Sequence, residues 1–479
     1  MRSATGWRAS ALVLIVAAAS AWAQPQGEGT LLENPHYRYV QSYTGTATCL
    51  ACHETQAKHV FGSVHYQWKG EAPNLTNAKG RIGKINSTND FCTNPAISWI
   101  AILTNDEGKV IGNGCSKCHA GLGARPSEEM SRAQLENIDC LICHAPNYRR
   151  EVVKKTDGLA WVPSAANNRE LMLNIAQNVV RPTNELCLRC HVGSGGGLNY
   201  KRGDLETAHL RPTRDFDVHM GSGMQCIQCH QFENHRVKGG GTLMGGMDIP
   251  NDQRPQCENC HAGEVHKEAT LNRHTAAVYC TTCHIPSFAR KDPTDMHRDW
   301  SKSELVKGEG RYEPAIELKS NVTPAYAWWN GNGTIALLDE PVKKGTNGKV
   351  AMYRPDGSIK DPKARIYAFK YHTGRLPVEL STGLMIPVQV GIVFRTANNL
   401  QAVKAGAKNY RGRDVPDADI GWIDTERYMG LFHEVQPKAK ALACNDCHMG
   451  GKRLDWKALG YKGDPMKEGG RRIKAGARG

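Results

Sequence analysis

The sequence predicts a mainly α-helical fold with extensive loops, in which bound groups fill much of the interior, and a small amount of β structure in the C-terminal part. Three observations predict it. Only 40% of the 479 residues are hydrophobic and 49 are glycine, which provides a modest apolar core for this length. One short motif of cysteine and histidine recurs eight times. The most β-like pattern, PVQVGIVF, falls late in the chain at residues 387–394.

Sixteen of the 17 cysteines belong to eight copies of the motif Cys-x-x-Cys-His. Two cysteines at this spacing can add their sulfurs to one haem, and the histidine that follows then binds the iron as the proximal ligand. The motif therefore predicts eight covalently bound haem c groups. The predicted attachment cysteines are Cys49 and Cys52, Cys115 and Cys118, Cys140 and Cys143, Cys187 and Cys190, Cys226 and Cys229, Cys257 and Cys260, Cys280 and Cys283, and Cys444 and Cys447; the predicted proximal histidines are His53, His119, His144, His191, His230, His261, His284 and His448.

Zinc sites and disulfides are the alternatives for paired cysteines. A structural zinc site needs a complete set of four ligands, and disulfides form in exported proteins. Here each cysteine pair carries its own histidine directly after it. This arrangement favours haem attachment over both alternatives.

The N-terminus resembles a secretory signal. Arg2 and Arg8 precede a short apolar run at residues 11–18, and Ala21-Trp22-Ala23 follows as a small-x-small cleavage site. The run is too short to span a bilayer as a helix. We therefore expect residues 1–23 to be a signal peptide, export to the periplasm, and no transmembrane segment after cleavage.

The formal net charge of +14 is compatible with a nucleic-acid partner when taken alone. Each haem, however, would bring two propionates, and lysine and arginine side chains are natural partners for these anions. Propionates within the protein would then neutralise much of the excess of lysine and arginine. We expect no nucleic-acid partner.

The remaining histidines decide whether the chain can be an enzyme. Of 19 histidines, eight are proximal, which leaves 11. If each haem took a second histidine, the protein would only transfer electrons; an enzyme needs at least one iron with an open or displaceable sixth position. The number of remaining histidines permits both an electron carrier and an enzyme.

The spacing of the motifs divides the chain. Seven of them lie between Cys49 and His284, and the eighth follows a stretch of about 160 residues. We predict a heptahaem region at residues 24–290, a C-terminal subdomain carrying haem 8 at 291–450, and a basic, disordered tail at 451–479. Within the subdomain, residues 424–434 are predicted to be helical.

Several local strings near the motifs resemble one family of proteins. They are DCLICH at 139–144, DVHMG at 217–221, LNRHT at 271–275, CTTCHIP at 280–286, PT at 293–294, DWS at 299–301 and NVTP at 321–324. With the late eighth motif, these strings make nearly the whole mature chain similar to the octahaem tetrathionate reductase family of periplasmic cytochromes. The resemblance implies a multihaem cytochrome c fold built around a packed haem cluster.

The resemblance also implies the ligands on the distal side of each iron. In that family seven haems are closed by two histidines, whereas haem 2 is catalytic and carries a lysine. Matching local strings leaves His36, His59, His209 and His297 without a role. The implied distal ligands are His65, His219, His235, His266, His274, His372, His433 and, at haem 2, Lys201.

The family places an asparagine and a cysteine beside the catalytic haem, and the matching residues here are Asn89 and Cys92. Cys92 is also the one cysteine outside the motifs, which by itself marks a candidate reactive thiol. A buried structural cysteine is the alternative for this residue.

The lysine ligand follows a glycine-rich turn in the family, and here the turn at 193–197 leads to Lys201. The sequence departs from the family three residues earlier, where Leu198 replaces an aspartate. This departure puts local proton delivery or substrate positioning in doubt. Weaker candidates for the ligand are Lys154 and Lys155.

The resemblance implies a reductase of small anionic or nitrogenous substrates at haem 2: tetrathionate to thiosulfate, and also nitrite and hydroxylamine. The other haems would relay electrons from a periplasmic or inner-membrane, quinol-linked cytochrome. Two alternatives remain from the sequence. One is an octahaem cytochrome that only transfers electrons, and the other is an oxidative enzyme of the hydroxylamine oxidoreductase type.

Overall fold

The computed structural model describes residues 35–83, 85–87, 89–92, 98–156, 158–192, 202–239 and 253–471. The predicted signal peptide, the glycine-rich turn at 193–197 with Leu198, and Lys201 lie outside these residues. Among the residues described, no helix combines the length and the apolar character that crossing a bilayer would require.

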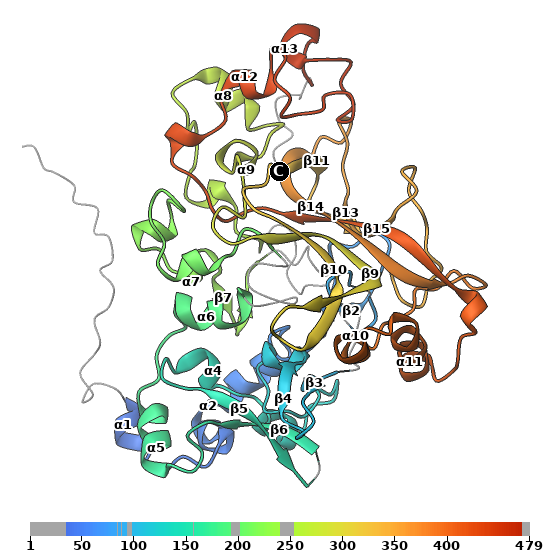
Figure 1. Cartoon of the computed structure of the whole chain (residues 1–479). Coiled ribbons are helices and arrows are strands. Elements are labelled where there is room, and N and C mark those ends of the chain that lie inside the picture. The colour runs from blue at the N-terminus through green and yellow to red at the C-terminus, as the bar shows by residue number, and fades with distance from the viewer. Residues whose placement is uncertain are drawn as a thin grey trace, which may run out of the picture.

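The N-terminal part, up to residue 290, consists of short helices and two-stranded ladders joined by loops (Figure 1). Its longest helix, α2, contains the first Cys-x-x-Cys-His motif. The helices are α1 (Pro35–Tyr39), α2 (Thr46–Phe61), α3 (Arg132–Glu136), α4 (Leu141–His144), α5 (Arg169–Gln177), α6 (Asn184–His191), α7 (Cys226–Cys229), α8 (Ala269–His274) and α9 (Cys280–His284); the ladders are β1 (Lys69–Glu71) with β2 (Arg81–Gly83), β3 (Ala101–Thr104) with β4 (Val110–Asn113), β5 (Arg150–Lys155) with β6 (Gly158–Pro163), and β7 (Phe232–Glu233) with β8 (Arg236–Val237).

The motifs adopt the same local geometry. Four lie on single helical turns, namely α4, α7, α9 and the late helix α12 (Cys444–Cys447), and two lie within the longer helices α2 and α6. Those at residues 115 and 257 begin 3-10 turns. Residues three apart in a helix lie on the same face. Each turn therefore brings its two sulfurs to one side, next to the histidine.

The C-terminal part is organised by a seven-stranded sheet, which crosses the centre of the molecule (Figure 1). The strand order is β10-β9-β14-β15-β13-β12, with β11 also paired to β14. β14 is central, pairing antiparallel with β15 and parallel with β9. The strands are β9 (Thr294–Val306), β10 (Arg311–Lys319), β11 (Ala325–Trp329), β12 (Gly333–Thr334), β13 (Val350–Pro355), β14 (Arg365–Glu379) and β15 (Ile420–Gly430).

The main apolar core lies between this sheet and helices α10 (Val390–Thr396) and α11 (Asn399–Arg411). The Asn398 side chain caps α11 by accepting from the Gln401 backbone N–H. Gly406 allows a close approach, since a Cβ there would lie 1.9 Å from the Pro387 carbonyl oxygen. This core contains aliphatic side chains and Trp300, so the C-terminal half has a conventional interior.

The secondary-structure content differs from the prediction, because strands make up 25% of the chain and helices 27%. The fold is therefore not mainly α. Residues 387–394 were predicted as β, yet α10 begins at Val390 and packs on β10. A short apolar run has no clear period, so burial against a sheet can make it helical.

Residues 424–430 lie in strand β15 and residues 431–434 are irregular, so the predicted helix at 424–434 is wrong. The pairing of β15 with β14 extends from Ile420 to Gly430, and this long ladder outweighs local helix propensity. The predicted disordered tail is also ordered as far as Arg471: Leu454 and Leu459 are buried, and the Trp328 indole N–H donates to the Leu459 carbonyl at 2.8 Å.

Candidate functional site

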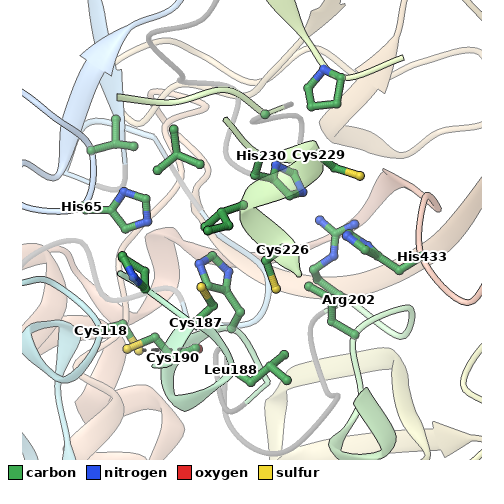
Figure 2. Close-up of a pocket in the computed structure, with 18 of the residues that line it drawn as sticks. His65, Cys118, Cys187, Leu188, Cys190, Arg202, Cys226, Cys229, His230 and His433 are labelled. Atoms are coloured by element: carbon green, nitrogen blue, oxygen red, sulfur yellow. Dashed lines mark hydrogen bonds between the residues drawn. The ribbon is translucent and has the colours of Figure 1, made fainter. Parts of the chain in front are cut away.

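A cavity of about 4510 Å³ runs between the short helices, and residues from seven of the eight motifs line it. A pocket for one drug-sized ligand has about 300–1,000 Å³. The cavity therefore has room for several large groups. Figure 2 shows part of it, where Cys187, Cys190, Cys226 and Cys229 surround the same space as His230.

Six motif histidines face a second histidine, and four of these pairs lie across this space. Their ring centroids are 5.9–6.3 Å apart. Two imidazole nitrogens that share a metal at about 2.0–2.1 Å, each about 1.15 Å from its ring centre, place the centroids about 6.4 Å apart. The pairs thus have the spacing for one iron between them, and they are His53 with His36, His191 with His65, His230 with His433, His261 with His219, His284 with His266 and His448 with His274.

In five of the six pairs, burial lowers the pKa of one histidine and so favours the neutral imidazole, which is the form that binds metal. Burial lowers the pKa of His191 to about 3, with His65 contributing. Burial also lowers the pKa of His230 to about 4, with His433 as the next cause. Figure 2 shows His230 and His433 near each other, with Arg202 beside them.

The structure places five of the predicted distal residues opposite motif histidines: His65, His219, His266, His274 and His433. His235 lies 6.4 Å from His59, and His144 is the first neighbouring charge that lowers its pKa after burial does. It is therefore near the third motif.

The roles expected for His36 and His372 both differ from what their surroundings indicate. His36, which sequence comparison left without a role, lies 5.9 Å from His53. His372 is instead enclosed between two carboxylates: its Nδ1 contacts Asp90 at 2.6 Å and its Nε2 contacts Asp295 at 3.1 Å. Both ring nitrogens are then occupied, which differs from the predicted role of His372 as an iron ligand. No local sequence pattern predicts that α1 packs beside the first motif.

The second motif has a different environment. In the described part of the chain, the ring contact of His119 is with Trp99, at 5.5 Å, and not with a second histidine. The Cys115 and Ser116 backbone N–H groups donate to the carbonyls of Ser98 and Trp99, so the segment before the motif holds it in place.

The motifs contact one another through their sulfurs, which here are free thiols standing where thioether sulfurs would be after haem attachment. Cys118 donates to the Cys190 carbonyl at 3.8 Å, which joins motifs 2 and 4 (Figure 2). The Cys187 thiol of the fourth motif also hydrogen-bonds with Cys226 of motif 5 and lies near Cys143 of motif 3, so the fourth motif is a branch point. Two further pairs of thiols share a hydrogen bond, and two others lie close enough for their charges to interact. The first two are Cys49 with Cys140 and Cys257 with Cys280, and the others are Cys229 with Cys260 and Cys283 with Cys444.

The predicted catalytic segment forms a tight turn. The Asn89 side-chain oxygen accepts from the Phe91 backbone N–H at 2.8 Å and from that of Cys92 at 3.4 Å. Asn89 is buried, while Cys92 is half-buried, lines the cavity and packs against the main core. Both arguments for Cys92, the reactive thiol and the packed cysteine, are therefore compatible with its position.

A buried charge cluster clamps this turn to the sheet. Arg427 Nε donates to Asp90 at 2.6 Å, and the Trp300 indole N–H donates to the Asp90 carbonyl at 2.8 Å. Every member of the cluster is at most 4% exposed in its side chain or residue. The cluster comprises Asp90, Asp295, Arg298, Lys370, His372 and Arg427.

The pKa values within the cluster follow its charges. Burial alone would raise the pKa of Asp90, but Arg427 and His372 outweigh it and lower the value. Burial lowers the pKa of Lys370 to about 7, and its Nζ donates to Thr294 at 2.6 Å. Of these residues the sequence analysis singled out only His372, because strands far apart in sequence bring the others together.

Comparison with known proteins gives the family. A family model described as "Cytochrome c bacterial" matches residues 295–451. An uncharacterized protein of Archaeoglobus fulgidus is 33% identical over 225 residues, covering 41% of this chain and 76% of that protein. The crystal structure of octaheme cytochrome c from Shewanella oneidensis matches with a TM-score of 0.72 and 32% identity, over 90% of this chain and 96% of that one. The chain belongs to the octahaem cytochromes c.

Covalent haem c attachment, predicted from the motifs, is confirmed by this membership, and a haem redox protein is established. The residues of this octahaem cytochrome fit the cofactor in three ways: the cavity volume, the paired sulfurs on single helical turns, and the separation of the histidine rings. The tetrathionate reductase subfamily is a narrower statement and belongs to the proposal below.

Proposed function

We propose that this octahaem cytochrome carries eight haem c groups and reduces small sulfur or nitrogen compounds at the haem of motif 2. The observation that carries the proposal is the contrast at His119. Six other motif histidines face a second histidine at the spacing for iron, and the seventh, His144, lies near His235. The ring contact of His119 in the described residues is instead with Trp99. An iron without a second histidine can take a displaceable ligand or a substrate.

The arrangement of the motifs supports this assignment. Motif 2 contacts motif 4, and motif 4 contacts motif 5 and lies near motif 3. When bound, the haems supply electrons, and closely spaced haems exchange them quickly. Motif 2 would then be the end of a side branch, which suits a place where electrons leave for substrate, while motifs 1, 3, 4, 5, 6, 7 and 8 form one continuous path.

Cys92 would act on sulfur substrates. A thiolate attacks sulfur–sulfur bonds. Attack on a central sulfur of tetrathionate breaks the central S–S bond, leaves the outer half on Cys92 as a disulfide and releases one thiosulfate. Two electrons then cleave that disulfide, release the second thiosulfate and restore the thiolate. The Asn89 turn holds the Cys92 backbone in place for this reaction.

Lys201 is proposed as the displaceable ligand. An amine binds metal only in its neutral form, so protonation competes with binding. After displacement, protonated Lys201 would add a positive charge for an anionic substrate. We also propose a periplasmic location and a cytochrome or quinol-linked electron donor, in line with the predicted signal at residues 1–23.

The test is steady-state turnover of the holo-protein with a reduced dye as donor and tetrathionate, nitrite or hydroxylamine as acceptor. Cys92→Ser should abolish most tetrathionate reduction but spare nitrite reduction, because nitrite needs no thiol. Ile102→Val is the matched control, since Ile102 packs against the same core as Cys92. Equal losses on both substrates contradict the role of Cys92.

The proposal also makes a spectroscopic claim. Electron paramagnetic resonance of the oxidised protein should show one haem that is high-spin or lysine-ligated, and Lys201→Ala should change that signal alone. Eight bis-histidine signals would contradict the catalytic role and would show that the protein only transfers electrons.

A further inference from the structure

Arg298 is a buried arginine whose guanidinium is fixed on two sides. It lies on β9, and its Nε donates to Asp295 at 2.7 Å. Its Nη1 donates to the Phe91 carbonyl, one residue before Cys92. The guanidinium carbon also lies 5.7 Å from the Phe91 ring and 5.9 Å from the Trp300 ring. These contacts leave the side chain little freedom to reorient.

The third nitrogen of this guanidinium lacks a partner. Nη2 is enclosed and has no hydrogen bond within the described structure, although the residue is only 3% exposed. Buried polar atoms are almost always hydrogen-bonded, so an exception in a well-ordered network indicates a partner that binds from outside the chain. A cationic N–H requires an acceptor, and an anionic oxygen is the strongest one.

The position of Arg298 favours a partner in the cavity. Arg298, Phe91, Cys92 and Trp300 all line it. Arg298, therefore, borders the same space as the thiol assigned above to substrate.

The charges around Arg298 also favour an anion. The buried charge cluster holds Arg298, Arg427 and Lys370 against the two carboxylates Asp90 and Asp295. His372 contacts those same two carboxylates through its ring nitrogens, Asp90 at 2.6 Å and Asp295 at 3.1 Å. The two arginines balance the two carboxylates, and Lys370, whose pKa is lowered to about 7, adds a partial positive charge at neutral pH. An anion that enters with its own acceptors would stabilise this buried excess.

We propose that Arg298 binds an oxyanion group of the substrate, namely a sulfonate end of a polythionate or an oxygen of nitrite, through Nη2. The inference rests on the proposed function and names the side chain of that site that binds its anionic substrates. Because the guanidinium is already held by Asp295 and Phe91, little conformational entropy is lost on binding. A haem propionate offers the same chemistry to Nη2, and the experiment separates the two sources.

The experiment measures binding to oxidised holo-protein by titration calorimetry with tetrathionate and with nitrite, and separately the KM for hydroxylamine, which is uncharged at neutral pH. Arg298→Lys and Arg298→Gln should raise both anion dissociation constants about 10- to 100-fold, the range expected for a hydrogen bond to a charged group. The KM for hydroxylamine should stay within about twofold. If Arg298→Gln does not accumulate with haem, Arg298→Lys carries the test, since lysine keeps the charge beside Asp295 and removes the second N–H edge.

Arg311→Lys is the matched control. Arg311 also lines the cavity, but it is held by Glu309 at 2.6 Å and Glu313 at 3.5 Å, so its substitution should leave anion binding unchanged. Unchanged anion affinity in the Arg298 variants overturns the inference, as does an equal loss for hydroxylamine. A shifted midpoint potential of one haem without loss of anion affinity identifies a propionate as the partner and also overturns it. Anion binding that depends on Arg298 in a protein without turnover would support the inference while the proposed function fails.

Discussion

Replacing His36 by alanine tests whether the histidine pairs hold iron. His36 lies on α1, and its ring centre is 5.9 Å from that of His53, against about 6.4 Å for two imidazoles that share one metal. Iron insertion therefore needs the rings to separate by only about 0.5 Å. Burial, with His53 and His144 contributing, lowers the pKa of His36, which favours the neutral form needed for binding.

The expected result follows from the number of motifs. If each of the eight motifs carries one haem, His36→Ala converts one haem in eight from low-spin to high-spin or water-bound. Spin quantitation by electron paramagnetic resonance should then show a loss of about one-eighth of the low-spin iron. Haem content should stay unchanged, because the cysteines of the first motif are intact.

His372→Ala is the informative comparison for His36→Ala. Because Asp90 and Asp295 occupy both nitrogens of His372, its removal should leave the low-spin count unchanged and reduce stability instead. Loss of low-spin iron in His372→Ala but not in His36→Ala would refute the assignment drawn from ring spacing.

Two further predictions concern buried carboxylates. Asp90→Asn leaves the charge of Arg427 without its carboxylate partner and weakens the contact with His372, so the free energy of unfolding should fall by about 3–5 kcal/mol, measured by denaturant titration against wild type. A change below about 1 kcal/mol would show that the cluster is not stabilising. Glu379 is 1% exposed, and the hydrogen bond from Arg413 lowers its pKa from 4.5 to about 2. Because the folded-state pKa lies below the unfolded one, this stabilisation is complete above about pH 4.5 and is lost as the pH falls toward 2. Glu379→Gln should therefore lower the free energy of unfolding by about 1–2 kcal/mol at pH 7, after discounting for the half-exposed Arg413. It should also flatten the acid limb of a plot of thermal midpoint against pH, and an unchanged limb would contradict the assigned cause.

Secondary structure in the C-terminal half shows where sequence reasoning was weak. Residues 424–434 were predicted to be helical, yet residues 424–430 join the ladder between β14 and β15. Residues 387–394 show the reverse, since the predicted β run is helical from Val390, where α10 begins against the sheet. In both places the decision depends on which partner surface is available, and that surface is assembled from distant segments.

The candidate site divides in the same way. Asn89 and Cys92 were found as one short string, and the structure places them in one turn at the cavity. The sequence did not indicate Arg298 as a site residue, because nothing in the sequence of β9 distinguishes it from other basic residues. Its significance comes from the contacts with Phe91 and Asp295 and from an enclosed nitrogen without a partner in the described structure.

The sequence by itself determined where haem is attached, because two cysteines and a histidine within five residues contain all the groups that the attachment chemistry needs. Only the tertiary structure decided which histidine lies opposite each motif. His230 and His433 come from opposite halves of the chain, and His36 reaches His53 through the placement of α1. Covalent attachment is a local reaction, whereas a second axial ligand is supplied by whichever segment packs across the cavity, and packing is a property of the whole fold.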